Sequence, residues 1–83
     1  MIMKIALKNK QTGLFVKHLR MAANHVNSIE YTDDIQEAFL YDKELYTKNE
    51  FGKNESWIGY QLRWCREKHN QLIEPVDVNV SLA

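Results

Sequence analysis

The chain has 83 residues, and its 11 basic side chains balance 11 acidic ones, so the formal net charge is zero. This length allows one domain with a modest core, and we treat residues 1–83 as a single domain. The charge balance argues against a dedicated nucleic-acid binder, which normally carries a basic excess, and equally against an acidic mimic of DNA.

The first nineteen residues predict a β-hairpin. Apolar and polar residues alternate from Met3 to Lys8, as in a half-buried strand. A turn follows, in which Gly13 can adopt a positive φ. Leu14–Leu19 contains good strand formers and is the expected second strand.

The middle of the chain gives weaker signals. Arg20–Ser28 fits a helical turn or a loop, and the sequence leaves both open. Ile29–Tyr31 predicts a short third strand. Asp34 can cap a helix and Glu37 follows at capping-box spacing, which predicts a helix of only one or two turns.

Ala38–Tyr41 could continue that helix or form a short fourth strand. A strand is favoured because Asp42 can cap another helix immediately afterwards. We expect this next helix over Lys43–Glu50, with Leu45 and also Tyr46 turned inward.

A longer helix is predicted further along the chain. Residues 51–54 should end the preceding helix, since glycine and asparagine tolerate conformations that stop helices. Asn54 or Ser56 can then cap a helix that runs to about Asn70. Its apolar residues form two stripes: Ile58, Leu62 and Cys65 in the first, and Trp57, Tyr60 and Trp64 in the second. One stripe is enough to dock a helix on a sheet, so the second widens the core, fills a pocket or meets a partner.

The end of the chain predicts a last strand. After Pro75, apolar residues alternate with polar ones to the end of the sequence. We expect Val78 and Val80 to be buried against Ile58 and Leu62. The elements together predict an α+β fold, in which helices pack on one face of a small antiparallel or mixed sheet. The sheet would consist of the N-terminal hairpin, the short third strand and the C-terminal strand.

The sequence contains no motif typical of an enzyme or a metal site. The three histidines, His18, His25 and His69, have no metal-ligand partner at a recognised spacing. Asp34 with Glu37 suits a helix start better than acid–base chemistry. Three widely separated glycines do not form a phosphate-binding loop. We therefore expect no catalytic residue, no cofactor and no metal.

Cys65 is the only cysteine, so no disulfide can form within the chain. It occupies an apolar helical position, which favours a small core residue over a reactive thiol. A lone thiol fits a reducing cytoplasm. No segment approaches the length of a transmembrane helix, and the N-terminus lacks the apolar run of a signal peptide. We expect a cytoplasmic protein without a membrane partner.

The leading candidate for a contact surface is the second apolar stripe. Trp57, Tyr60 and Trp64 are residue types that dominate interface energetics, and Arg63 and Arg66 could form a polar rim beside them. The partner would be another protein or a second copy of the chain, and a homodimer is expected. The alternative is that the three aromatic residues extend the core.

A second candidate surface lies on the N-terminal hairpin. Lys8, Lys10, Lys17 and Arg20 fall within the first twenty residues, which contain no acid. Such a patch could face phosphates of a nucleotide or nucleic acid, with the aromatic helix stacking on bases. The zero net charge makes this alternative less favoured. In addition, the charged faces of hairpins are usually just solvated.

Two phrases of the sequence carry a resemblance. Lys8–Lys17 and Tyr31–Leu40 resemble the opening hairpin and the following strand-cap-helix phrase of small proteins encoded by phages and prophages of low-GC Gram-positive bacteria. The resemblance covers about the first half of the chain. It implies a compact accessory protein that binds and blocks a host or defence component. It assigns a role to no individual residue.

Overall fold

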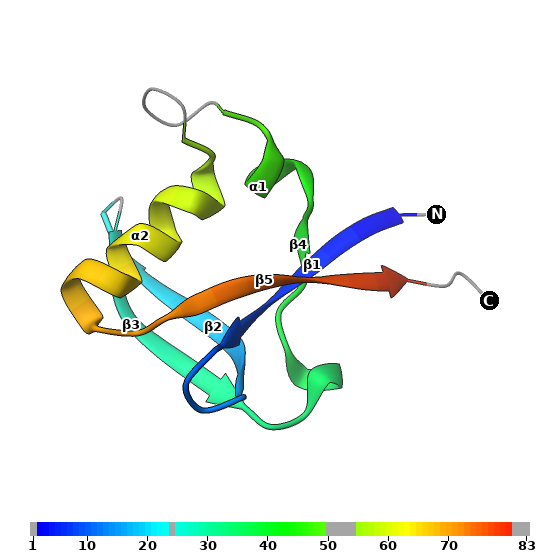
Figure 1. The fold of residues 1–83 in the computed structure, drawn as a ribbon, viewed down its shortest axis with the longest axis horizontal. Coiled ribbons are helices and arrows are strands. Elements are labelled where there is room, and N and C mark those ends of the chain that lie inside the picture. The colour runs from blue at the N-terminus through cyan, green and yellow to red at the C-terminus, as the bar shows by residue number, and fades with distance from the viewer. Residues whose placement is uncertain (1, 24, 50–54, 81–83) are drawn as a thin grey trace.

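A computed structural model describes residues 2–23, 25–49 and 55–80 of the chain, and at positions 2, 79 and 80 the backbone alone. Across these residues it shows five antiparallel strands, two α-helices and one 3-10 turn (Figure 1). The elements are β1 (Ile2–Asn9), β2 (Phe15–Ala22), β3 (His25–Thr32), η1 (Ile35–Glu37), β4 (Tyr41–Asp42), α1 (Glu44–Thr47), α2 (Trp57–His69) and β5 (Ile73–Val80). The α+β class and the small antiparallel sheet are thus confirmed.

The central strand of the sheet is β1. Its whole length pairs with β5 on one edge. The other edge pairs with β4 near the start of β1 and with β2 near its end, and β3 continues the sheet beyond β2. Helix α2 contacts both β3 and β5, so it covers the side of the sheet between these two outer strands (Figure 1).

The first predicted hairpin is confirmed. β1 and β2 are joined by a turn in which Gly13 has a φ of 77°. The Oδ1 atom of Asn9 accepts the backbone N–H groups of Gln11 (2.8 Å) and Thr12 (3.1 Å). An asparagine that binds the backbone two residues ahead is a common device for fixing a turn.

A second hairpin replaces the loop or helical turn expected over Arg20–Ser28. β2 continues to Ala22, and Ala23 follows in the left-handed region with a φ of 56°. β3 then has eight residues, where the sequence predicted three. The strand was missed because Val26 is the one apolar residue among His25–Ser28, while Asn27 and Ser28 are exposed, as side chains on an outer strand can be.

The segment after β3 follows the prediction in part. Asp34 caps η1, with its Oδ1 accepting the N–H of Gln36 (2.9 Å), and the helix is one turn long. Of the strand favoured for Ala38–Tyr41, only Tyr41 is in a strand, because β4 covers Tyr41–Asp42. Asp42 does not cap the next helix, because it belongs to β4 and pairs with Lys4.

Helix α1 is shorter and more exposed than expected. It covers Glu44–Thr47 rather than Lys43–Glu50. Leu45 and Tyr46 were expected to face inward, but 40% and 39% of their surfaces remain exposed. A helix of one turn can bury few side chains. The stop expected at residues 51–54, and the alternative cap at Asn54, lie outside the described residues.

Helix α2 begins and ends as predicted. The Oγ atom of Ser56 accepts the N–H of Gly59 (2.9 Å), which is an N-cap bond. Asn70 ends the helix in the left-handed conformation, with a φ of 54°. The buried face consists of Ile58, Gln61 and Cys65, all with no exposed surface.

The core lies between α2 and the inner face of the sheet. It is formed by Ile5, Leu7, Val16, Leu19, Val26, Ile58 and Cys65. The first predicted stripe of α2 therefore meets the first strand as expected, and Cys65 is a core residue.

The predicted inner face of β5 is wrong. Directly opposite residues of paired strands lie on the same face. Leu7 stands opposite Pro75 and Lys4 stands opposite Val78, so Pro75 shares the core side while Val78 lies on the other side. Val78 is only half-buried and does not join the core around Ile58. The side chain of Val80 lies outside the described residues, as does Leu82. Alternation alone leaves the choice of face open, and a shift by one residue reverses it.

A polar cluster closes one end of the core. Asn9, with no exposed surface, donates through Nδ2 to the hydroxyl of Tyr31 (2.9 Å) and to Oε1 of Gln71 (2.8 Å). The Tyr31 hydroxyl donates in turn to Oε1 of Gln71 (3.1 Å). The cluster joins the first turn, β3 and the connection between α2 and β5, and so fixes the position of β5 beside α2.

Candidate functional site

One flank of α2 carries the predicted aromatic stripe. The ring of Trp57 lies 6.4 Å from that of Tyr41, and Trp64 lies between His25 (4.8 Å) and Tyr60 (6.2 Å). Both tryptophans pack against the core and are half-buried. These contacts favour the interpretation that the stripe extends the core, with its outer edges left accessible.

The two predicted arginines belong to the opposite flank of α2. Arg63 and Arg66 line a groove between α2 and β5, and neither tryptophan does. The five residues predicted as one surface therefore divide into two groups. The guanidinium of Arg63 does reach back over the ring of Tyr60 at 5.2 Å.

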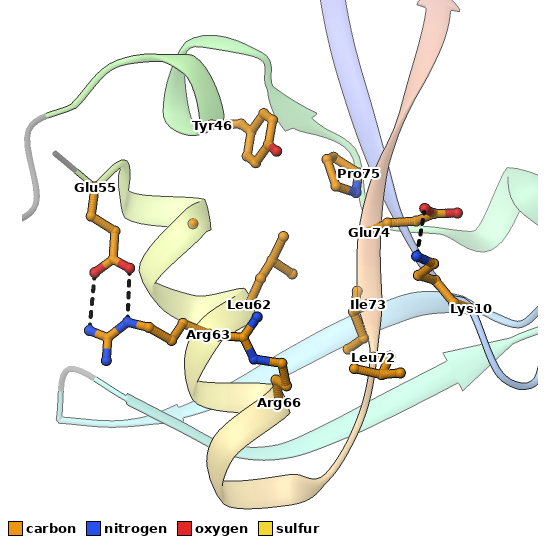
Figure 2. Close-up of a pocket in the computed structure, with 11 residues that line it drawn as sticks. Lys10, Tyr46, Glu55, Leu62, Arg63, Arg66, Leu72, Ile73, Glu74 and Pro75 are labelled. Atoms are coloured by element: carbon orange, nitrogen blue, oxygen red, sulfur yellow. Dashed lines mark hydrogen bonds and ion pairs between the residues drawn. The ribbon is translucent and has the colours of Figure 1, made fainter.

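We call this hollow the α2–β5 groove. It has a volume of about 450 Å³. It is lined by Lys10, Tyr46, Glu55, Gly59, Leu62, Arg63, Arg66, Leu72, Ile73, Glu74 and Pro75. Figure 2 shows Leu62 and Arg66 on the α2 side, with Ile73 and Pro75 facing them from β5 and Tyr46 of α1 above.

About half of the groove wall is apolar, and the other half is polar or charged. Leu62 and Ile73 are half-buried and rest against the core, so they form a fixed base. Leu72 is 42% exposed, and Tyr46 adds an aromatic ring from α1. No sequence pattern indicated that these residues would meet, because they come from different elements whose placement depends on the register of β5.

Most charges around the groove neutralise each other. The guanidinium of Arg63 donates to both carboxylate oxygens of Glu55 (2.8 and 3.1 Å), and these hydrogen bonds lower the pKa of Glu55. The Nζ atom of Lys10 lies 4.0 Å from a carboxylate oxygen of Glu74. Within the described residues, Arg66 has no such partner, so it is the uncompensated charge of the groove.

Hydrogen bonding along β1 alternates between its two neighbours. The N–H of Lys10, just after the strand, donates to the carbonyl of Leu72 on the β5 side (2.8 Å). The N–H of Asn9 donates instead to the carbonyl of Leu14 on the β2 side (2.8 Å). Because successive residues of a strand turn their backbone groups in opposite directions, the even-numbered residues of β1 bond to β5.

The residues of β5 opposite the odd-numbered positions of β1 are Ile73, Pro75, Asp77 and Asn79. Their backbone groups therefore point away from β1, toward the free edge of β5 that borders the groove. Pro75 has no N–H to offer. The edge beside the groove thus presents the N–H of Ile73 and the carbonyls of Ile73 and Pro75, but the proline prevents a continuous ladder with another strand.

The predicted phosphate-facing residues are mostly paired with acids. Lys10 lies near Glu74, and Lys17 lies 3.6 Å from Glu37. Arg20 is paired with Glu30, and that hydrogen bond lowers the pKa of the Glu30 carboxyl. Lys8 lies over the ring of Phe15 at 5.8 Å. This pairing weighs against a free phosphate-binding patch on the hairpin.

A second hollow lies beside α1. It has a volume of about 600 Å³ and is lined by Met3, Asp42, Lys43, Glu44 and Thr47. Two of its three charged side chains have partners, since Asp42 pairs with Lys4 and the Nζ atom of Lys43 lies 3.2 Å from Asp77. It therefore offers less for recognition than the α2–β5 groove.

The described part of the chain brings no three His, Cys, Asp or Glu side chains together as a metal site. The Nε2–H of His69 donates to the carbonyl of Val26 at the free edge of β3 (2.8 Å), so this ring has a structural role. Burial raises the pKa of the Cys65 thiol to about 11, which disfavours the reactive thiolate.

Alkaline pH is expected to destabilise the fold. Burial raises the pKa of Cys65 from 9.0 to about 11 and that of Tyr41 from 10.0 to about 12. The folded state favours the neutral, protonated form of both groups. Their contribution to the free energy of unfolding is therefore complete below the unfolded pKa values and is lost as pH rises through the folded values. The free energy of unfolding should fall from about pH 9 to about pH 12. In the Cys65→Ala variant, the free energy of unfolding should begin to fall about one pH unit higher than in wild type. Urea titrations that gave the same onset for the variant and wild type would contradict this.

No family model, curated protein or solved structure matches the chain. The resemblance to phage and prophage proteins stays a prediction, and so does the homodimer. None of the helices in the described residues has the length and apolar character needed to cross a membrane.

Proposed function

We propose that this protein acts by binding another protein, without catalysis, and that the α2–β5 groove is its contact site. The observation that carries this proposal is Arg66, an arginine without an ion-pair partner among the described residues, beside the apolar part of the groove wall and a free strand edge. Arginine next to buried apolar surface is a common centre of binding energy at protein interfaces. The proposal includes a cytoplasmic location and the accessory, inhibitor-like role that the resemblance implies.

The charge distribution favours a protein partner over nucleic acid. Binding to phosphates requires several cations on one face. Here the cations of the hairpin lie beside acids, as in the pairs of Lys17 with Glu37 and Arg20 with Glu30. A groove with one uncompensated charge and partly apolar walls suits a few side chains of a protein.

Photo-cross-linking tests this proposal. A photo-reactive amino acid placed at Leu72 lies in the groove, and the same residue placed at Met21 on β2 is a control that lies outside it. Both positions are similarly exposed, at 42% and 38%. In an extract of the organism that produces the protein, we expect one dominant protein cross-linked from position 72 and not from position 21.

Equal products from the two positions, or none from position 72, would contradict the proposed site. A product at twice the chain mass would identify a second copy as the partner and would support the homodimer expected from the sequence. Light scattering of the unmodified protein at the same concentration would then be expected to show the dimer.

A further inference from the structure

The described cations differ in how well they are compensated, and this difference points to the ligand of the groove. Lys4, Lys10, Lys17, Arg20, Lys43 and Arg63 each lie within 4.0 Å of a carboxylate. Lys8 and Lys68 lie over aromatic rings. Arg66 has neither kind of contact within the described residues. Arg63 also lies 3.6 Å from Glu67, which is outside the groove. Among the residues that line the groove, the pairs of Arg63 with Glu55 and Lys10 with Glu74 cancel, and the positive charge of Arg66 is left, which is complementary to an anion.

The apolar part of the groove wall indicates that the ligand also carries an apolar group besides its negative charge. Leu62, Ile73 and Pro75 present apolar surface from both sides of the groove, and Leu72 is exposed at its end. The volume of about 450 Å³ lies toward the low end of ligand sites. It is enough for a few side chains and too small for a folded surface. The occupant therefore combines a negative group with an apolar side chain.

The free edge of β5 adds a backbone contact. The N–H and carbonyl of Ile73 turn toward the groove, and one residue of an extended chain can bond to both. Pro75, two residues further on, interrupts such pairing because it lacks an N–H. The edge thus suits a short extended segment and disfavours a long added strand.

We infer that the α2–β5 groove binds an extended peptide segment of a partner protein in which an Asp or Glu stands beside an aliphatic or aromatic residue. The carboxylate pairs with Arg66, the apolar side chain rests on Leu62 and Pro75, and the backbone bonds to Ile73. This inference rests on the proposed function and specifies the partner at the same site.

A selection from short random-sequence peptides tests it. Immobilised wild-type protein should enrich peptides with an acidic residue next to an apolar one. Arg66→Glu should reverse the preference toward Lys or Arg, since it reverses the one uncompensated charge of the groove. Lys68→Glu is the matched control: it makes the same charge change on the other flank of α2, over Trp64, and should keep the acidic preference.

A selected peptide should bind Arg66→Gln at least about tenfold more weakly than wild type, the loss expected for one charge-assisted hydrogen bond. In nuclear magnetic resonance spectra, the peptide should shift the amide signal of Ile73 and leave that of Met21 unchanged. Thermal melting of each variant should match wild type, because Arg66 is exposed.

Three results of the selection would overturn the inference: enriched peptides without an acidic bias, a bias that survives Arg66→Glu, or no enrichment. None of these would decide the proposed function, because cross-linking from Leu72 reports on a protein partner of any shape. A cross-link at Leu72 without peptide enrichment would mean that the partner is recognised as a folded surface. Peptides that bind but shift signals away from Ile73 would overturn the placement in the groove.

Discussion

Replacing Ile58 by Ala is expected to lower the free energy of unfolding by about 2–5 kcal/mol. Ile58 has no exposed surface and lies in the core cluster, where α2 meets β1. The substitution removes buried apolar atoms and leaves a cavity that the surrounding side chains fill only in part. A domain of this size has a small core, so a loss in this range would remove much of its stability.

The matched control for this substitution is Ile35→Ala. Ile35 lies in the 3-10 turn η1 and is 41% exposed, so the same loss of atoms should cost about 0.5 kcal/mol or less. Urea unfolding followed by circular dichroism gives both values. Equal losses in the two variants would show that α2 does not rest on the sheet as described.

The sequence predicted the elements whose signals are local. The first hairpin follows from alternation and the turn at Gly13, and α2 follows from its cap at Ser56 and its stop at Asn70. These features depend on a few neighbouring residues and not on the rest of the chain. β3 was mostly missed, because an outer strand can carry polar residues such as Asn27 on its exposed positions.

The inner face of β5 could not be predicted from the sequence. The valines after Pro75 alternate, but the structure places Ile73 and Pro75 on the core side. The choice depends on pairing between β5 and β1, two strands at opposite ends of the chain. A one-residue change of register would exchange the two faces completely.

The separation of Arg66 from the aromatic stripe follows from the sequence alone. Arg66 follows Trp57 by nine residues, and at about 100° per residue this places the two on opposite sides of a helix. The groove itself could not have been found in this way. Leu72 and Pro75 approach Arg66 only because β5 pairs with β1 and the Asn9 cluster holds the start of β5 beside α2.

A buried polar side chain in α2 gives the second large expected effect. Gln61 has no exposed surface, and neither atom of its amide has a hydrogen-bond partner within the described residues. A buried polar group without a partner destabilises a protein by about 1–3 kcal/mol. Methionine has the same unbranched length without an amide, so Gln61→Met should raise the free energy of unfolding by about 2 kcal/mol.

The same substitution at Gln71 provides a control with the opposite expected sign. Gln71 accepts hydrogen bonds from Asn9 (2.8 Å) and Tyr31 (3.1 Å), so Gln71→Met would leave both donors without their partner. We expect a loss of about 1–3 kcal/mol. The urea unfolding curves of the two variants should therefore lie on opposite sides of the wild-type curve. If Gln61→Met destabilised the protein as Gln71→Met does, its amide would have to be satisfied in solution, and the buried face of α2 would be hydrated.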